Sequence, residues 1–412
     1  MLIFRALQSK NYRLFFAGQA FSNLGNMMKQ VAIGWLVYRL TDSALLLGVV
    51  SFSREISAFL FSTLAGVMAD RYNKHKLLMF CQGAVSLNAA LLAWLTLSDQ
   101  ISVAILIVLQ VLFGLISGLE MPSRHAFVND LVEDKSYLTN AIALNSSLFN
   151  TARIVGPAIA GILIPLIGEG YCFLLYAILS FSVVLIFLFI RYIPIPKEVS
   201  KRNFLEEFKE GARFSLKTKH IRLILVLVSG ITLLGVSYMV VLPVFAADVF
   251  QADAVVFGYM TSAVGLGSLL GAFFVGAKNN AMGLDKWILI GTIIFGIALG
   301  TFALSPYLWL SLLALVATGL GRVIIFTGSN TLLQTIAPEE KRGRILSFYI
   351  MLFMGALSLG SFAIGWVTDL VGGPLTLAGG SVGVLIMALY YSRNLLAFRK
   401  STYKVMRQSG AA

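Results

Sequence analysis

The chain has 412 residues, of which 58% are hydrophobic and only 12% are charged, with a formal net charge of +13. Soluble domains carry about 25% charged residues, so this composition excludes an ordinary soluble globular protein. The basic residues flank long apolar blocks and form no patch interleaved with aromatic residues, which argues against nucleic-acid binding. Cys81 and Cys172 lack the spacing of a metal site or a disulfide, so we expect both to be packing residues.

Twelve apolar blocks follow one another along the chain. Each has roughly 20–26 residues, the length that a helix needs to cross a bilayer. The blocks lack the period-two alternation of a membrane β-barrel, so we expect α-helices. The first block is too long for a cleaved signal peptide and is interpreted as a retained helix. The expected spans are residues 14–39, 45–69, 77–96, 101–121, 138–166, 171–190, 221–247, 254–276, 286–305, 307–330, 345–369 and 374–394.

The basic residues gather at alternate ends of these spans. With the N-terminus in the cytoplasm, most of the 32 Lys and Arg residues fall in cytoplasmic segments, and of the few others only Arg39 lies at an outer end. The opposite orientation would place nearly all of them outside. Because cytoplasmic loops carry the excess of Lys and Arg, we expect both termini to be cytoplasmic.

A charged connection near the midpoint, residues 191–220, separates six spans from six. Phe204, Phe208 and Phe214 among its charges predict an amphipathic helix at the inner membrane surface, with a solvated linker as the alternative. The similar segments LVEDKSYLTNA and APEEKRGRILS lie 206 positions apart, half the chain length, which indicates a duplicated six-helix unit. We therefore expect an all-α membrane protein with twelve transmembrane helices in two pseudo-symmetric six-helix bundles. Its parts are residues 1–190, the linker 191–220, residues 221–395 and a basic cytoplasmic tail, 396–412.

A charged turn ends the second span. Gly66, Asp70, Arg71, Lys74 and Lys76 form the pattern G-x-x-x-D-R-x-x-K-x-K, which resembles the signature loop between helices 2 and 3 of the major facilitator superfamily of transporters. A plain basic loop is the alternative. The resemblance implies that Asp70 braces this loop against the start of helix 11, beside positive groups and the helix N-terminus. The cytoplasmic gate then comprises Gly66, Asp70, Arg71, Lys74, Arg342 and Arg344.

The fourth and fifth spans are similar to one branch of this superfamily, which contains enterobactin exporters and macrolide-efflux proteins. A P-x-R motif follows the fourth span, an A-R-x-x-G-P-x-x-A-G motif lies in the fifth, and EEKRGRILSFY matches the branch's loop before helix eleven. In the fifth span, Gly156, Pro157 and Gly161 would allow close packing and a bend. The motif residues are Pro122 and Arg124, then Ala152, Arg153, Gly156, Pro157, Ala160 and Gly161.

Several spans carry polar residues deep in apolar sequence. Such residues are costly in lipid and face a cavity or another helix; for the uncharged ones, holding helices together is the alternative role. In the first span Gln19, Asn23, Asn26 and Gln30 form one stripe, which Lys29 flanks. The predicted substrate cavity comprises Asn23, Asn26, Lys29, Gln30, Arg54, Asn150, Arg153 and Arg322.

Glu55 is the acidic residue expected well inside a span, and Lys29 and Arg153 lie at a similar depth, roughly 21–23 Å from the cytoplasmic side. Glu55 is therefore the predicted proton-coupling residue, with a permanent ion pair to Lys29 or Arg54 as the alternative. Together with Lys29, Arg54, Arg153 and Arg322, the deep charges sum to +3. That excess favours an anionic or acidic amphiphilic cargo. Pinning helix five to a neighbour is the alternative role of Arg153.

No catalytic constellation or P-loop pattern is present, and the three histidines are scattered in connections, so we expect no enzyme, cofactor or metal site. The resemblance implies a secondary transporter with a central site between its halves: a proton-coupled exporter of a small acidic or amphiphilic molecule, such as a siderophore. A broad-specificity drug or macrolide pump is the alternative, and a lipid scramblase or a non-transporting receptor is an alternative of another class. The expected partners are the cargo, protons and membrane lipids. The expected form is a monomer in the plasma membrane, the inner membrane of a bacterium.

Overall fold

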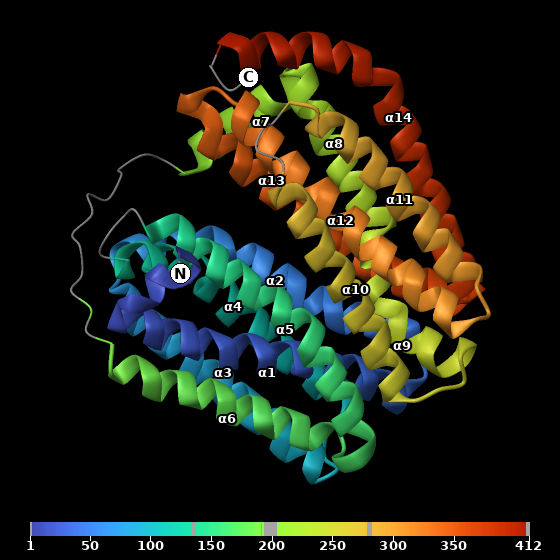
Figure 1. Ribbon diagram of the computed structural model, residues 1–412. Helices are drawn as coiled ribbons and strands as arrows, with labels where there is room; N and C mark the ends of the chain where they lie inside the picture. The colour runs from blue at the N-terminus through green and yellow to red at the C-terminus, as the bar shows by residue number, and fades with distance from the viewer. Residues whose placement is uncertain (1, 133–136, 191, 193–203, 278–281, 409–412) are drawn as a thin grey trace. The chain divides into compact units, whose positions relative to one another are not determined.

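The computed structural model describes residues 2–132, 137–190, 192, 204–277 and 282–408, without the side chains of 2–4, 63–71, 125–126, 139, 204–208, 400–401 and 403–408. These residues are almost entirely helical and include no β-strand (Figure 1). Eleven helical runs among them are long and apolar enough to cross a membrane. The long helices are α1 Lys10–Thr41, α2 Ala44–Arg71, α3 Lys74–Leu97, α4 Val103–Leu131, α5 Leu138–Ile167, α6 Glu169–Leu188, α8 Lys219–Leu234, α10 Ala254–Gly276, α11 Leu284–Leu304, α12 Leu308–Ile336, α13 Arg342–Val371 and α14 Gly373–Gln408.

Helix α1 is the twelfth, and it is less apolar than the others because the predicted polar stripe lies in its middle. At its C-terminal end Arg39 forms a bidentate pair with Glu169 of α6, with N–O distances of 2.8 and 3.2 Å. Such a charged pair suits the edge of a bilayer, where solvent reaches the guanidinium. The prediction of twelve membrane helices in two sets of six is confirmed.

The chain forms two compact units, which are described separately below. The first unit comprises residues 1–200 with 246–262, and the second comprises residues 201–245 with 263–412. The boundary falls inside α10, whose first turns belong to the first unit: the Ser262 hydroxyl donates to the Ile154 carbonyl of α5 at 2.8 Å. The two halves predicted from the sequence, residues 1–190 and 221–395, are the two copies of the duplicated six-helix unit. Their bounds stay a prediction.

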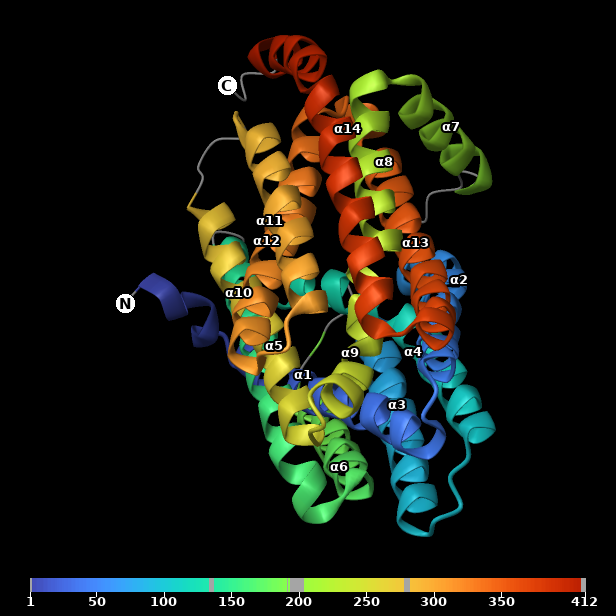
Figure 2. The ribbon, with the colours of Figure 1, turned by 90° about the vertical axis from the view of Figure 1, so that its right-hand side faces the viewer.

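The same helix pairs pack together in each unit. In the first unit α1 packs on α5 and α6, and α3 packs on α6. In the second unit α8 packs on α13 and α14, and α11 packs on α14; Figure 2 shows α8 beside α13 and α14. Counted along each half, these are in both cases the first helix with the fifth and sixth, and the third with the sixth. A duplicated six-helix unit produces this repetition.

Glycines allow the second and fourth helices of each half to cross closely. A β-carbon added at Gly118 of α4 would lie 2.8 Å from the Ala58 carbonyl oxygen of α2. The equivalent crossing in the second unit involves Gly319 of α12, where an added β-carbon would lie 3.0 Å from the Ser268 nitrogen of α10. Membrane helices associate through such close packing because lipid leaves little hydrophobic driving force between them.

The first membrane helix of the second half is interrupted. After α8 the chain continues as a 3₁₀ segment, Val236–Val241, the short α9, Leu242–Val244, and a π-helical turn, Phe245–Val249. Gly235 and Pro243 lie at the breaks, where glycine weakens a helix and proline removes a backbone donor. The run Lys219–Val249 still has the length and apolarity of one span.

A helix lies in the connection between the halves. It is α7, Phe204–Lys217, and it packs on α13 in the second unit. Glu210 of α7 forms ion pairs with Arg344 and with Lys341, the latter at 3.4 Å. The Lys341 ammonium also lies 4.6 Å from the centre of the Phe214 ring. The linker helix is therefore fixed to the start of α13 by charge and by an aromatic contact.

Candidate functional site

The polar stripe of α1 lies largely inside the first unit. Gln19 and Asn23 are buried, and Asn26 and Gln30 are half-buried. The Asn26 side-chain oxygen is shielded from solvent and accepts no hydrogen bond from the described residues. A stripe that faces neighbouring helices has the geometry of a polar interior, which fits both roles left open by the sequence.

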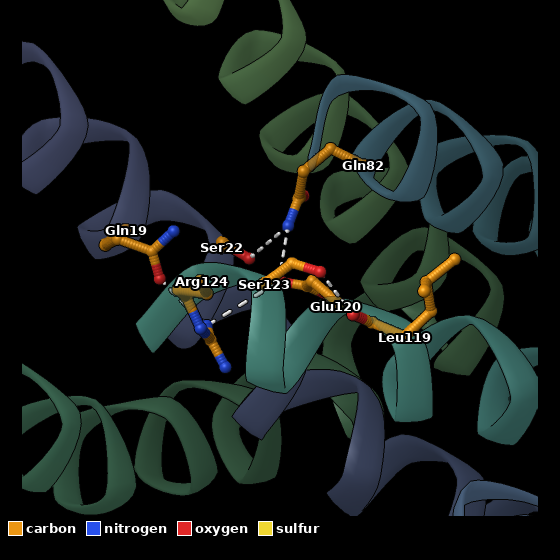
Figure 3. Close-up of polar contacts among 7 residues, drawn as sticks. All are labelled: Gln19, Ser22, Gln82, Leu119, Glu120, Ser123 and Arg124. Atoms are coloured by element: carbon orange, nitrogen blue, oxygen red, sulfur yellow. Dashed lines mark hydrogen bonds and ion pairs between the residues drawn. The ribbon is translucent and has the colours of Figure 1, made fainter. Parts of the chain in front are cut away.

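Glu120 is the centre of a polar network that joins α1, α3 and α4 (Figure 3). The Gln82 amide donates to Glu120 Oε1 at 2.9 Å, and the Arg124 guanidinium lies 3.6 Å from the same oxygen. Arg124 also donates to Gln19 Oε1 at 2.8 Å, and Gln82 donates to the Ser22 hydroxyl at 3.5 Å. The network links the Glu120 carboxylate and the Arg124 guanidinium of α4 to the side-chain amides of Gln19 on α1 and Gln82 on α3.

Sequence reasoning missed the role of Glu120, because it placed this residue at the inner end of a span that ends at 121. Helix α4 instead continues to Leu131, although Pro122 lies inside it. The available signal was the spacing of Glu120 and Arg124, four residues apart, which places both on one helix face. Read with the P-x-R motif, that spacing pointed to a buried ion pair.

Glu55 pairs with its neighbour on α2. Its Oε1 lies 3.3 Å from Arg54 Nη2, and the two side chains are 14% and 26% exposed. Arg54 is one of the two ion-pair partners, Lys29 and Arg54, that the sequence analysis allowed for Glu55. Both side chains are partly exposed, and the proton-coupling role of Glu55 stays a prediction.

Lys29 is buried in the first unit, with 1% of its surface exposed. Its Nζ lies 2.8 Å from the centre of the Phe113 ring and 5.0 Å from that of Tyr176. This nitrogen makes no hydrogen bond to any described residue. It therefore does not bond to Glu55 or to Arg153, which the similar depths had suggested it could meet. Equal depth fixes the level of a side chain but not the direction in which its helix face points.

Helix α5 carries the remaining predicted residues of the first unit. Asn150 is half-buried, and the Arg153 guanidinium carbon lies 4.7 Å from the centre of the Phe149 ring. The predicted close packing is visible at Gly156, where an added β-carbon would lie 2.6 Å from Met27 Cβ of α1. Pro157 lies within α5, and an added β-carbon at Gly161 would lie 3.0 Å from Gly258 Cα.

Arg322 is the predicted cavity residue of the second unit. Its guanidinium donates to the Ser268 hydroxyl at 3.3 Å and lies 3.4 Å from the Met239 sulfur. Neither partner carries a charge, and no ion pair involving Arg322 occurs among the residues that the structure describes. The second unit thus holds a cation on α12 whose partners are neutral.

The predicted gate is only partly within the described residues. Gly66, Asp70 and Arg71 lie in the stretch 63–71, whose side chains are not described, so the expected contact of Asp70 lies outside the described residues. Arg342 is exposed, and Arg344 forms the ion pair with Glu210 of α7 given above.

Lys74, the fourth gate residue, is buried in a polar cluster of the first unit. Its Nζ lies 2.5 Å from Asp130 Oδ2, which also accepts from the Tyr192 hydroxyl at 2.8 Å. Burial and the Asp130 carboxylate raise the pKa of Tyr192. Tyr192 follows α6, so this cluster connects the ends of α3, α4 and α6.

We expect Lys74→Met to lower the free energy of unfolding by about 3–5 kcal/mol, because it leaves the Asp130 carboxylate buried without its cation. Thermal melting of the purified protein in detergent measures the loss. Lys76→Met is the matched control, since Lys76 is exposed, and it should change stability by about 0.5 kcal/mol or less. Equal melting temperatures for the two variants would show that the Lys74 pair is dispensable.

Charged side chains inside two similar six-helix bundles are typical of a membrane transporter. Among the described residues no group of three or more His, Cys, Asp or Glu could hold a metal ion. The family described as "Transmembrane secretion effector", a major facilitator family, matches residues 3–408, and the chain belongs to it. Its members are multi-pass membrane transporters and not enzymes.

Three proteins are similar to this chain over most of its length. The chain is 27% identical to the staphyloferrin A transporter of Staphylococcus aureus, over 94% of this chain and 97% of that protein. It is 24% identical to the enterobactin exporter EntS of Shigella boydii, over 94% and 92%. It is 26% identical to the multidrug efflux pump Tap of Mycolicibacterium fortuitum, over 89% and 91%.

Solved structures support the fold. A transporter of the POT family in complex with 5-aminolevulinic acid superposes with a TM-score of 0.75 at 12% identity, over 95% of this chain and 97% of the other. A point mutant of the nucleoside transporter NupG superposes with a TM-score of 0.72 at 15% identity, over 95% and 99%.

Proposed function

We propose that this chain exports a small acidic amphiphile of the siderophore type by alternating access, driven by proton entry. The observation that carries the proposal is Arg322, an intramembrane cation whose described partners, Ser268 and Met239, are both neutral. A charge within the bilayer is costly unless it is paired. An anionic group on the cargo would supply a counter-ion, which the described residues of the second unit do not provide for Arg322.

The relatives support the same class of cargo. Two of the proteins described above are named for siderophores, and each matches nearly the whole length of this chain. The excess of positive charge in the spans would attract such a cargo more strongly than an organic cation.

Glu55 remains our candidate for proton coupling. It lies within α2, half-buried next to Arg54, where a change of partner or of hydration alters the balance between its two protonation states. We place both termini in the cytoplasm, the protein in the inner membrane as a monomer, and the Asp70 loop with Arg342 and Arg344 at the cytoplasmic gate. The positive-inside distribution of Lys and Arg supports this orientation.

Broad-specificity drug efflux is the second candidate. It is favoured by the resemblance to Tap and by an open groove of about 360 Å³ between α12 and α13. Phe326, Tyr349 and Phe353 line this groove together with Asn330 and Gln334, and none of these side chains is charged. Aromatic rings and neutral amides suit many amphiphilic molecules, so the groove by itself does not demand an acid.

Ligand-induced thermal stabilisation of the purified protein tests the proposal, followed by transport into everted membrane vesicles with an imposed pH gradient. Staphyloferrin A and enterobactin are the siderophore probes, and ethidium is the cationic drug probe. We expect the siderophores to raise the melting temperature and to accumulate uphill only with the gradient. Stabilisation and accumulation of ethidium alone would favour the drug pump, and no gradient dependence for any probe would contradict proton-driven export.

A further inference from the structure

Two buried lysines lie in the first unit, and their surroundings are opposite. Lys74 has the Asp130 carboxylate 2.5 Å away. Lys29 is more deeply buried and has no hydrogen-bond partner among the described residues. Its nitrogen lies 2.8 Å from the centre of the Phe113 ring and 5.0 Å from that of Tyr176. One lysine is held as half of an ion pair, whereas the other is enclosed by aromatic carbon.

An ammonium at the position of Lys29 is poorly stabilised. The group has three N–H donors and no hydrogen-bond partner among the residues that the structure describes. An isolated buried charge commonly gives up its proton instead of staying ionised. The contacts with the two rings favour a cation, but they offset only part of the cost of removing it from water. A neutral amine fits the same space without that cost.

The charged groups that act on Lys29 have opposite signs. Arg54 of α2 opposes an ammonium, and Glu120 of α4 favours one. The Glu120 carboxylate is, however, already engaged by the Gln82 amide and by Arg124. In this arrangement the acid that could stabilise a charged Lys29 is shared with other partners.

We propose that Lys29 is a second proton-binding residue of the transport cycle, neutral in this arrangement and an ammonium when water or a released Glu120 carboxylate reaches it. The proton passes between Nζ and water that enters the bundle, and no other bond is made or broken. This role rests on the proposed function, because only a proton-driven cycle uses such a group. Helix α1 carries Lys29 and also Gln19, which accepts a hydrogen bond from Arg124. An ammonium at Lys29 that attracts Glu120 would therefore compete with Arg124 for the same carboxylate.

The protonation state can be measured directly and without a cargo. The full-length protein is labelled with ¹⁵N-lysine, purified in detergent and studied by NMR at neutral pH. We expect one lysine nitrogen with the chemical shift of a neutral amine, absent from Lys29→Met and retained in Lys76→Met. Only ammonium signals in the wild type would overturn the proposal.

Stability and transport test the role in the cycle, with the two siderophore probes used above. Lys29→Met should fold with an unchanged or higher melting temperature, yet lose the acceleration of probe transport by a pH gradient. Lys29→Arg, which cannot be deprotonated, should melt at a lower temperature. If the wild type is driven by the gradient and Lys29→Met is driven equally, the inference is wrong. If the wild type is not driven at all, the proposed function fails and the role of Lys29 in a cycle fails with it, whereas the amine signal still decides the protonation state.

Discussion

Replacing Glu55 with glutamine is expected to reduce proton-driven uphill transport to the level of protein-free vesicles. Glutamine keeps the size and the hydrogen-bonding capacity of the side chain but cannot bind or release a proton. Cargo binding and downhill exchange should be partly retained, because neither needs net movement of protons. The measurement is uptake into everted vesicles with an imposed pH gradient, compared with exchange at equal pH.

The control for this prediction is another acid of the same unit. Glu169 pairs with Arg39 at the ends of α6 and α1, away from the middle of the spans. Glu169→Gln should leave the gradient dependence intact. Glu55→Gln leaves Arg54 without its carboxylate partner, so the melting temperature of each variant is measured beside its transport. Undiminished uphill transport by Glu55→Gln would refute the coupling role and leave the ion pair with Arg54 as its function.

Replacing Arg322 with glutamine is expected to weaken the binding of an acidic cargo about 10- to 150-fold. A hydrogen bond to a charged group contributes about 1.5–3 kcal/mol, and each 1.4 kcal/mol corresponds to a factor of about ten in affinity. Isothermal titration with an anionic probe that stabilises the wild type gives the affinity directly. The neutral groups around Arg322, Ser268 and Met239, lose little when the guanidinium is removed.

A lysine at the same position separates recognition from packing. Arg322→Lys keeps the positive charge. If this charge attracts anions, the variant should largely retain its affinity for the anionic probe. A packing arginine should instead lose stability as lysine, because lysine lacks the planar fork of donors. Arg39→Gln is the control, since Arg39 is largely exposed and paired with Glu169. Equal affinity of the wild type and Arg322→Gln for anionic probes would contradict the argument from charge.

Much of the fold was predictable because the bilayer imposes simple rules on a sequence. Span length follows from hydrocarbon thickness and helix type from backbone satisfaction. Helix α1 shows the limit of hydropathy alone: its polar middle makes it less apolar than the other eleven. Its length and its place in the chain identified it all the same.

The candidate site was predictable by residue type and depth, but not by partner. Lys29, Glu55 and Arg153 were placed at one level from their positions along the chain. The structure puts Lys29 among aromatic rings and pairs Glu55 with Arg54. Rotation of a helix about its axis decides such neighbours, and that rotation is set by contacts with other helices rather than by the local sequence.

By itself, the sequence determined the class of protein, the twelve spans and the identity of the deep charges, because these follow from composition, length and motif. Only the tertiary structure decided that Glu120 joins Gln82 and Arg124 in one network, and that Lys29 is enclosed without an acceptor. Glycines let α2 and α4 approach closely, and the continuation of α4 past Pro122 carries Arg124 toward α1. A pairing between residues far apart in the chain has an energy only when packing brings them within a few ångströms, so no pattern along the chain could reveal it.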